Sequence, residues 1–345
     1  MADLFPKTQK LFNVDGLMQL VSRDPNKLNT EGKRFDAMFK FARERHLVYL
    51  RRAAGLPKPW SQDWTLQSYR YCNIYRELDS VSLWIQEHLI KPFEQTDQLP
   101  FLMVAARIFN KPETLGPLLD AGVLGGQRFN PDRAMEVLRK VKADQGAVFN
   151  SAYIINGIPK KGSPEREGKI GTVVYDVLEP FWKDRKKTAA EFKTTMSSAL
   201  DALQGYHGMG RFMAYQVCVD LSYSQHWLMN APDLNELTSP GPGTTQGAKF
   251  LAGCFKDRET NLSQDEINWY LMETRRLSFI DSYWPVDSIR GKTYADGFVP
   301  LTIPNCSNTF CETSKAMALW LGHRDRLKNR YPGTLERDLR QQPLF

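Results

Sequence analysis

Apolar residues recur at helical spacing along most of this chain and alternate at strand spacing over very little of it. The pattern predicts helices over Arg34–Ala54, Asp63–Leu89 and Asn130–Gln145, and two further helices that begin at the capping boxes Thr188–Glu191 and Ser263–Glu266. The best apolar run for a strand, Ala147–Ile155, is equally compatible with a helix. The sequence therefore predicts a mainly α fold.

Three stretches rich in glycine, proline and polar residues predict loops: Pro159–Gly171, Ser239–Gly247 and Ser288–Pro304. The first of these (PKKGSPEREGKIG) is polar enough to be a mobile surface loop or a connection between two lobes. We therefore divide the chain into an N-terminal extension (1–33), a helical catalytic domain (34–320) that could have two lobes with a mobile loop at 159–171, and a charged C-terminal tail (321–345).

The composition is that of an ordinary globular protein. Of 345 residues, 42% are hydrophobic and 25% are charged, which excludes wholesale disorder and suffices for a full core. Lys and Arg number 46 against 39 Asp and Glu, so the formal net charge is +7. This excess favours a polyanionic partner such as nucleic acid, although over a chain of this length the bias is mild.

Cysteine usage and the N-terminus bear on the cellular compartment. The five cysteines have no CxxC or histidine pairing that would ligate zinc, so we expect buried thiols in a reducing compartment, and no metal or other cofactor. Met1–Lys10 has no apolar run that suits a signal peptide, and no apolar stretch of about 18 residues occurs. We expect a soluble, cytoplasmic protein with no membrane partner.

A pair of helices joined by a glycine-rich turn is predicted within Leu203–Asp220 (LQGYHGMGRFMAYQVCVD). A capped helix, Thr188–Leu203, leads into the turn, and a second apolar helix follows. Gly208 and Gly210 would leave backbone N–H groups open at the start of that second helix, where the helix dipole favours a DNA phosphate. An ordinary tight turn has the same pattern, but the flanking helices and the basic Arg211 favour a helix-hairpin-helix phosphate-binding element.

Polar residues border an apolar face in the predicted helix Asp63–Leu89. Tyr71, Ile74, Tyr75, Leu78, Val81 and Ile85 form the apolar face at helical spacing. Arg70, Asn73 and Glu77 then fall on one stripe beside it, with Arg76 further round. Such a stripe could face a cleft, and a solvated charged edge would explain it equally well.

Two weaker motifs lie in the C-terminal third. Pro240–Gly243 (PGPG) is a glycine-rich stretch that could present amides at Gly241 and Gly243 to phosphates, although a plain connecting turn is the simpler interpretation. Leu301–Lys315 is interpreted as an irregular lead into a helix that carries Glu312 and Lys315 at i,i+3 spacing.

Several stretches, taken together and in order, resemble one known family. They are Glu44-Arg45, Gly55–Asp63, Arg70–Asp79 with Trp84, Val148–Tyr153, Gly210–Asp220, Pro240–Gly243, Leu301-Thr302, and Cys311-Glu312 with Lys315. They resemble the phage α-glutamyl/putrescinyl-thymine pyrophosphorylases, or amino acid:DNA transferases, which share a helical domain with 5-hydroxymethyluracil DNA kinases. The resemblance runs from about Phe35 to Lys315. The sequence departs from the family in two places. Pro304-Asn305-Cys306 stands where a more regular helix start is expected. No P-loop accompanies the helical domain, and this argues against the chain being itself the kinase.

The resemblance implies a fold and a reaction. The fold would be related to helix-hairpin-helix DNA glycosylases. Phages of this kind place 5-hydroxymethyluracil in DNA, and a kinase converts its hydroxymethyl group to a pyrophosphoryl ester. The implied enzyme displaces pyrophosphate with the amine of an amino acid or polyamine. Its expected partners are double-stranded DNA carrying the modified thymine and a free amine, with glycine, glutamate, serine and a diamine all open, in the cytoplasm of the host cell.

The implied reaction suggests roles for matching residues. The target carbon sits on a base, so the nucleotide would be flipped from the duplex. A departing pyrophosphate needs cationic donors, and an attacking amine needs a proton acceptor. The expected catalytic residues are Arg70, Asn73, Glu77, Asp220 and Glu312; the expected substrate-binding residues are Arg76, Tyr215, Gln216 and Lys315; the expected DNA-binding residues are Gly208, Gly210, Arg211, Gly241 and Gly243.

Two other functions stay open at this point. A helix-hairpin-helix glycosylase acting on a modified base would release free base. A non-catalytic DNA-binding module would bind DNA and leave its mass unchanged.

Overall fold

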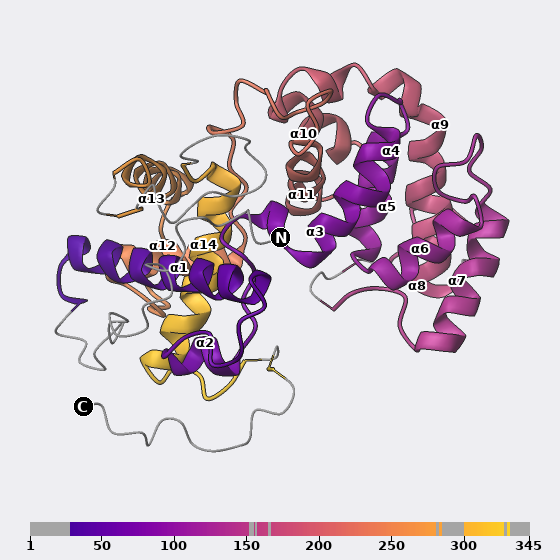
Figure 1. Ribbon diagram of the computed structural model, residues 1–345. Coiled ribbons are helices and arrows are strands. Elements are labelled where there is room, and N and C mark those ends of the chain that lie inside the picture. Colours follow the sequence, from indigo (N-terminus) through magenta and orange to yellow (C-terminus); the bar gives the residue numbers. More distant parts are fainter. Residues whose placement is uncertain are drawn as a thin grey trace. The chain divides into compact units, whose positions relative to one another are not determined.

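The computed structural model describes residues 28–151, 155, 157–164, 167–280, 283–284, 300–327 and 330–331. Within them the regular structure is helical, with one isolated β-bridge between Tyr69 and Arg330 and no β-strand (Figure 1). The predicted mainly α fold is confirmed. The chain divides into two compact units: unit 1 is Met1–Arg76 with Pro240–Phe345, and unit 2 is Glu77–Ser239.

Helix α1 (Glu31–Ala53) is the longest described helix of unit 1 (Figure 1). Its N-cap Thr30 accepts a hydrogen bond from the Lys33 backbone N–H (3.4 Å), so the helix starts slightly before the predicted Arg34. It ends just before Gly55, whose φ of +74° lies in the left-handed region that favours glycine. Phe39 and Phe41, which point to opposite sides of the helix, are both buried.

Helices α12 (Pro242–Ala252) and α14 (Ile303–Trp320) pack closely against each other in unit 1. A Cβ at Gly243 would overlap the Cys311 sulfur, and a Cβ at Gly247 would lie 2.5 Å from the Phe310 backbone oxygen. The prediction of a loop over Ser239–Gly247 is therefore wrong after Gly241. Proline suits a first helical position, and the two glycines give close helix packing instead of an open turn.

The start of α14 also differs from the prediction. An irregular lead was expected over Leu301–Lys315, but the helix is regular from Ile303. Thr302 caps it by accepting from the Asn305 backbone N–H (3.4 Å), and Pro304 lies in the first turn, where no N–H is needed. Helix α13 (Gln264–Leu277) begins at the predicted capping box of Ser263, which is confirmed.

The predicted continuous helix over Asp63–Leu89 is wrong. Asp63 does cap a helix, but α2 (Trp64–Ser68) is short and the chain is irregular over Tyr69–Tyr75. After it come η5 (Arg76–Leu78, a 3-10 helix), α3 (Ser80–Ile85) and η6 (Gln86–Ile90, a π-helix). Side chains of α14 bond to the backbone of the irregular stretch, and this tertiary contact outweighs the helical periodicity.

Unit 2 is built around α5 (Leu99–Phe109), every residue of which is buried. Helices α10 (Met196–Gln204) and α11 (Arg211–Leu221) pack on each other, and α11 packs on α5. The other elements are α4 (Lys91–Phe93), α6 (Pro112–Asp120), α7 (Pro131–Gln145), α8 (Gly168–Gly171), η7 (Thr172–Leu178), α9 (Glu179–Thr188) and η8 (Glu191–Lys193). Helix α7 is confirmed with its predicted cap, the Asn130 side chain, which accepts from the Arg133 backbone N–H (3.0 Å).

The predicted capping box at Thr188–Glu191 is wrong. Thr188 is the last residue of α9, and its hydroxyl donates to the Asp184 carbonyl (3.3 Å). The helix before the hairpin begins only after Thr195, the N-cap of α10, which accepts from the Ser198 backbone N–H (3.0 Å). Asp233 reinforces this cap by accepting from the first two amides of α10, at 2.7 and 2.8 Å.

Several predicted segments fall partly outside the described residues. Of the extension 1–33, residues 1–27 lie outside, and of the tail 321–345, residues 328–329 and 332–345 do. In Ser288–Pro304, residues 288–299 lie outside, and in Pro159–Gly171, residues 165–166 do. The apolar run Ala147–Ile155 is irregular up to 151, and 152–154 lie outside. In the part that the structure describes, no helix is long and apolar enough to cross a membrane.

Candidate functional site

One face of α14 fixes a stretch of irregular backbone in unit 1. Asn305, Asn308 and Glu312 recur at i, i+3 and i+7, which places them on the same side of the helix. The bonds are Arg76 N to Asn305 Oδ1 (3.2 Å), Asn308 Nδ2 to Asn73 O (2.7 Å) and Cys72 N to Glu312 Oε2 (3.4 Å). The segment that carries Asn73 and Arg76 is thus held on the helix that carries Glu312.

A buried carboxylate and a lysine pair on the same helix. Lys315 Nζ donates to Glu312 Oε1 at 2.5 Å. Glu312 is 2% exposed, whereas the Lys315 side chain is 36% exposed. Both carboxylate oxygens therefore accept hydrogen bonds, one from the lysine and one from the Cys72 backbone. We call Cys72–Arg76, Asn305, Asn308, Glu312 and Lys315 the α14 cluster.

Lys315 is held as a cation. Burial disfavours its ammonium form, but the neighbouring Glu312 carboxylate outweighs this and raises the pKa of Lys315 above its usual value. The amine therefore stays protonated at neutral pH. A fixed ammonium suits the stabilisation of anionic oxygens and does not suit nucleophilic attack.

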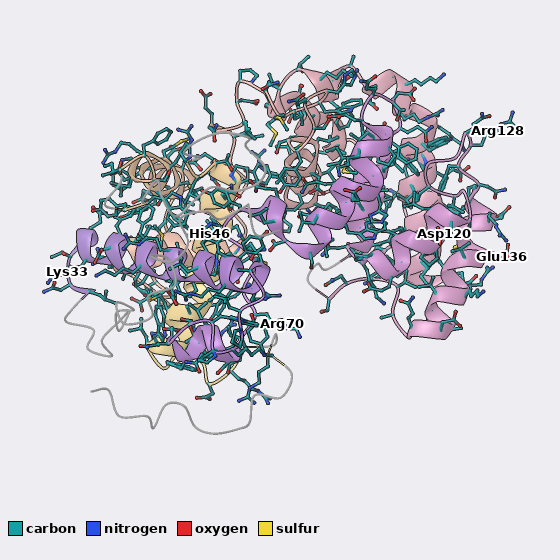
Figure 2. All side chains as sticks on the ribbon, in the orientation of Figure 1. Lys33, His46, Arg70, Asp120, Arg128 and Glu136 are labelled. Atoms are coloured by element: carbon teal, nitrogen blue, oxygen red, sulfur yellow. The ribbon has the colours of Figure 1, made fainter. Side chains whose placement is uncertain are left out.

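Arg70, predicted to be catalytic, and Arg76, predicted to bind substrate, belong to the same unit. Arg70 is exposed, near α2 in Figure 2, and its guanidinium lies 5.5 Å from the centroid of the Tyr331 ring. Arg76 is half-buried and reaches α14 through its backbone N–H.

Arg70, Asn73 and Glu77 do not share a helical stripe, which corrects the geometric premise drawn from their spacing. The chain is irregular between Tyr69 and Tyr75, so a 100° repeat does not apply there. Arg70 and Asn73 lie in unit 1, whereas Glu77 is buried in η5 and belongs to unit 2.

The predicted pair of helices with a glycine turn is present in unit 2. Between α10 and α11, Gly208 has φ +75°, Met209 is buried and Gly210 is the N-cap of α11. Gly208, Gly210 and Arg211 are exposed, and Arg211 Nη2 donates to the Thr238 carbonyl (3.3 Å). The first amides of α11 therefore open at a surface with no side-chain cap over them.

The other α11 candidates are buried. Tyr215 donates its hydroxyl to the Leu237 carbonyl (3.3 Å), and Gln216 is also buried. Asp220 is fully buried and accepts two hydrogen bonds from the Arg107 guanidinium of α5. Arg107 also donates to Asn110 (3.2 Å), so this geometry favours a structural role in which Asp220 ties α11 to α5.

The two glycines of the PGPG stretch occupy different environments. Gly241 is the N-cap of α12, while the α-carbon of Gly243 faces Cys311 of α14. Gly243 is therefore committed to helix packing, which leaves little room for a phosphate at that position.

Sequence reasoning missed Asn305 and Asn308 in unit 1 and the partners of Asp220 in unit 2. The signal for the asparagines was their spacing from Glu312, which becomes visible once the helix starts at Ile303. The signal for Arg107 was a single arginine inside the apolar run Leu99–Phe109, since a buried charge needs a partner.

Cysteines and metal ligands add no further site. All five cysteines are free; Cys218 and Cys306 are buried, which raises the pKa of their thiols, whereas Cys72 is exposed, contrary to the expectation of buried thiols. Among the described residues, no group of three or more His, Cys, Asp or Glu side chains could hold a metal ion.

The predicted site residues divide between the two units. Unit 1 contains Arg70, Asn73, Arg76, Gly241, Gly243, Glu312 and Lys315; unit 2 contains Glu77, Gly208, Gly210, Arg211, Tyr215, Gln216 and Asp220. The α14 cluster brings together four of the unit 1 residues: Asn73, Arg76, Glu312 and Lys315. The hairpin brings together Gly208, Gly210 and Arg211 within unit 2.

Comparison with known proteins assigns the chain to a family. Residues 32–319 match the family described as "5-hmdU DNA kinase, helical domain". The 5-hmdU DNA kinase of Bacillus phage SP10 is 28% identical over 246 residues, which are 66% of this chain and 37% of that protein. The chain thus matches well under half of the kinase's length, and no solved structure matches it. Since the matched range includes every helix from the second residue of α1 almost to the end of α14, the chain belongs to the family of 5-hmdU DNA kinase helical domains.

Proposed function

We propose that this chain takes part in the hypermodification of thymine in phage DNA, as a transferase that replaces the pyrophosphate of 5-(pyrophosphoryloxymethyl)uracil with an amine. Its family is named for a kinase of 5-hmdU DNA, and phosphorylation of a 5-hydroxymethyl group makes the kind of ester that such a transferase consumes. The observation that carries the proposal is the ion pair between Glu312 and Lys315, which supplies a fixed cation beside a carboxylate.

The reaction defines what the site must do. The amine lone pair attacks the 5-methylene carbon, a C–N bond forms, and the C–O bond breaks with its electrons leaving on pyrophosphate. The nitrogen then loses one proton. Cations must stabilise the departing oxygens, and a base must accept the proton.

The α14 cluster has groups for each task. We assign Lys315 and Arg76 of the cluster, with Arg70 of the same unit, to the departing pyrophosphate, because ammonium and guanidinium groups pair with phosphate oxygens. Glu312 keeps Lys315 charged and oriented through Oε1. Its Oε2 is held by one longer bond of 3.4 Å, and we assign this oxygen as the proton acceptor for the amine. Asn73 would orient substrate.

The α10–α11 hairpin is proposed to hold a DNA phosphate on the open amides of α11. Gly210 is the cleaner position at which to test this, because a Cβ there meets nothing within 4 Å and its φ is negative. Gly210→Val should therefore fold normally and weaken duplex binding by blocking the phosphate. Gly32→Val, at an exposed and uncrowded glycine of α1, serves as its control. Unchanged affinity in folded Gly210→Val would remove the hairpin assignment.

The activity is tested on DNA carrying 5-(pyrophosphoryloxymethyl)uracil, incubated with separately labelled amino acids and polyamines and then digested to nucleosides for mass spectrometry. A nucleoside heavier by the amine is expected, and thymine or 5-hydroxymethyluracil DNA should be inert. Lys315→Met should lose about 100- to 1000-fold in rate, the usual effect of removing a contact to a developing oxyanion. Lys33→Met, an exposed lysine of α1, should not (Figure 2).

Other outcomes would point to other functions. Released free base would indicate a glycosylase, and bound but unchanged DNA would indicate a binding module. Turnover of 5-hydroxymethyluracil DNA that requires ATP would place kinase activity in this chain. Each of these results would overturn the transferase proposal.

A further inference from the structure

Among the described residues, Ile158 is the large hydrophobic side chain most open to solvent, with 66% exposure. A single exposed isoleucine is common on protein surfaces and by itself needs no explanation. Ile158 differs in that hydrogen bonds hold its backbone and that exposed lysines follow it in the chain.

The backbone around Ile158 is pinned on both sides. The bonds are Thr172 Oγ1 to Gly157 O (3.3 Å), His207 Nε2 to Ile158 O (2.8 Å) and Lys160 N to Asp176 Oδ2 (3.1 Å). The side chain is therefore carried outwards on a fixed piece of main chain. A side chain on a fixed main chain loses less conformational entropy when it inserts into a binding partner.

The partner of Ile158 belongs to the hairpin. His207 lies in the turn between α10 and α11, so its hydrogen bond connects the segment Gly157–Lys160 to that turn. Phe212, in the first turn of α11, is a second large apolar side chain with 45% exposure. Unit 2 thus presents two exposed apolar side chains on segments joined through His207.

The charges beside Ile158 are basic. Lys160 and Lys161 follow it and are exposed, and Arg211 is exposed on the hairpin. Asp176, the acid that bonds to this segment, is itself buried and accepts the Lys160 amide. Lysine is depleted in the cores of protein–protein interfaces, whereas lysines around an apolar tip suit a phosphate backbone.

We propose that Ile158, with Phe212 beside the hairpin, is a wedge that enters the base stack of duplex DNA while Lys160 and Lys161 contact the flanking phosphates. The inference rests on the proposed function and deepens it, since an enzyme that takes its target base into an active-site pocket must first unstack that base. Apolar side chains placed between base steps unstack them in this way.

The test uses an unmodified duplex of about 20 base pairs with one 2-aminopurine, whose fluorescence rises when it unstacks. Wild-type protein should raise the signal. Ile158→Ala should lose most of that rise even at saturating protein, and should bind roughly 10-fold more weakly, in keeping with the loss of one buried aliphatic side chain. Leu83→Ala, an exposed aliphatic residue of α3, is the matched control and should behave as wild type.

Lys160→Ala with Lys161→Ala separates phosphate contact from wedging. The double variant should bind more weakly and lower the salt slope of log affinity by about 2, while the fluorescence at saturation stays. A full 2-aminopurine signal from saturated Ile158→Ala would overturn the wedge.

This assay needs no pyrophosphorylated substrate, so its result is independent of the transferase assay. Unstacking that depends on Ile158 without any amine product would keep the wedge and overturn the proposed function. Amine product together with unstacking that does not depend on Ile158 would support the proposed function and overturn the wedge.

Discussion

The side-chain amide of Asn308 donates a 2.7 Å hydrogen bond to the backbone carbonyl of Asn73, 235 positions earlier in the sequence. In a helix that carbonyl would be satisfied by the chain itself, four residues on. Here a residue of α14 satisfies it, so the irregular stretch has a defined place on the helix. The bond joins the two chain segments of unit 1 that unit 2 separates in sequence.

Asn308→Ala should disturb the site more than the fold. Loss of the amide removes this hydrogen bond, which should lower the free energy of unfolding by about 1 kcal/mol. The proposed transferase rate should fall further, up to about 100-fold, because a shift of about 1 Å in a positioned group has that effect. Denaturant unfolding and the nucleoside assay measure the two quantities. Asn268→Ala, on α13 of the same unit, is the control, and equal rates in both variants would argue against a positioning role.

Gly247→Ala should destabilise unit 1 through helix packing. The added methyl group would lie 2.5 Å from the Phe310 backbone oxygen, and neither backbone can yield cheaply. Overpacking of this kind typically lowers the free energy of unfolding by about 1–3 kcal/mol. Gly32→Ala in α1 of the same unit meets nothing within 4 Å and should instead be neutral or stabilising by up to about 1 kcal/mol. Thermal melts of the two variants that coincide would contradict this account of the glycines.

Asp220→Asn should act on stability, since Asp220 is fully buried against Arg107. Removing one partner of such a pair leaves an uncompensated buried charge, which typically lowers the free energy of unfolding by about 3–5 kcal/mol. Replacing both residues with apolar ones should recover much of that loss. Asp120→Asn, at an exposed site of α6, should change little (Figure 2). A stable but inactive Asp220→Asn protein would restore Asp220 as a catalytic candidate.

The sequence correctly predicted those helix ends and turns that depend only on residues close together in the chain. The cap at Asn130 and the capping box at Ser263 are satisfied within a few residues, and both were correctly placed. The glycine turn before α11 was visible for the same reason, since Gly208 needs a positive φ.

Long-range contacts explain the failures. The spacing in Asp63–Leu89 is helical, but Asn305, Asn308 and Glu312 supply the backbone bonds that a helix would have made internally. The family resemblance could therefore supply candidate site residues, whereas their arrangement could not be derived from the sequence. Arg70, Asn73 and Glu77 would form one stripe only on a regular helix, and the contacts with α14 hold this stretch in an irregular conformation.

His46 of α1 gives unit 1 a pH dependence that can be predicted with its sign (Figure 2). It is buried between Tyr49, Tyr75 and Trp284, and within the described residues neither ring nitrogen has a hydrogen-bond partner. Burial, and to a smaller extent the charge of Arg45, lowers the pKa of His46 from 6.5 to about 4.

Between pH 6.5 and 4 the unfolded chain therefore binds a proton at His46 that the native protein does not, so stability falls as the pH falls through this window. The slope from this group is about 1.4 kcal/mol per pH unit, which amounts to about 3 kcal/mol by pH 4 and is absent above pH 6.5. Carboxylates also titrate here, so the measurement is the difference in unfolding free energy between wild type and His46→Phe at pH 7.5, 6, 5 and 4.5. His46→Phe keeps an aromatic ring and removes two buried nitrogens, and should gain on wild type steadily as the pH falls. His88→Gln, at an exposed histidine of unit 2, should run parallel to wild type. A constant difference between His46→Phe and wild type over this range would show that His46 accepts its proton equally well in the folded and unfolded states.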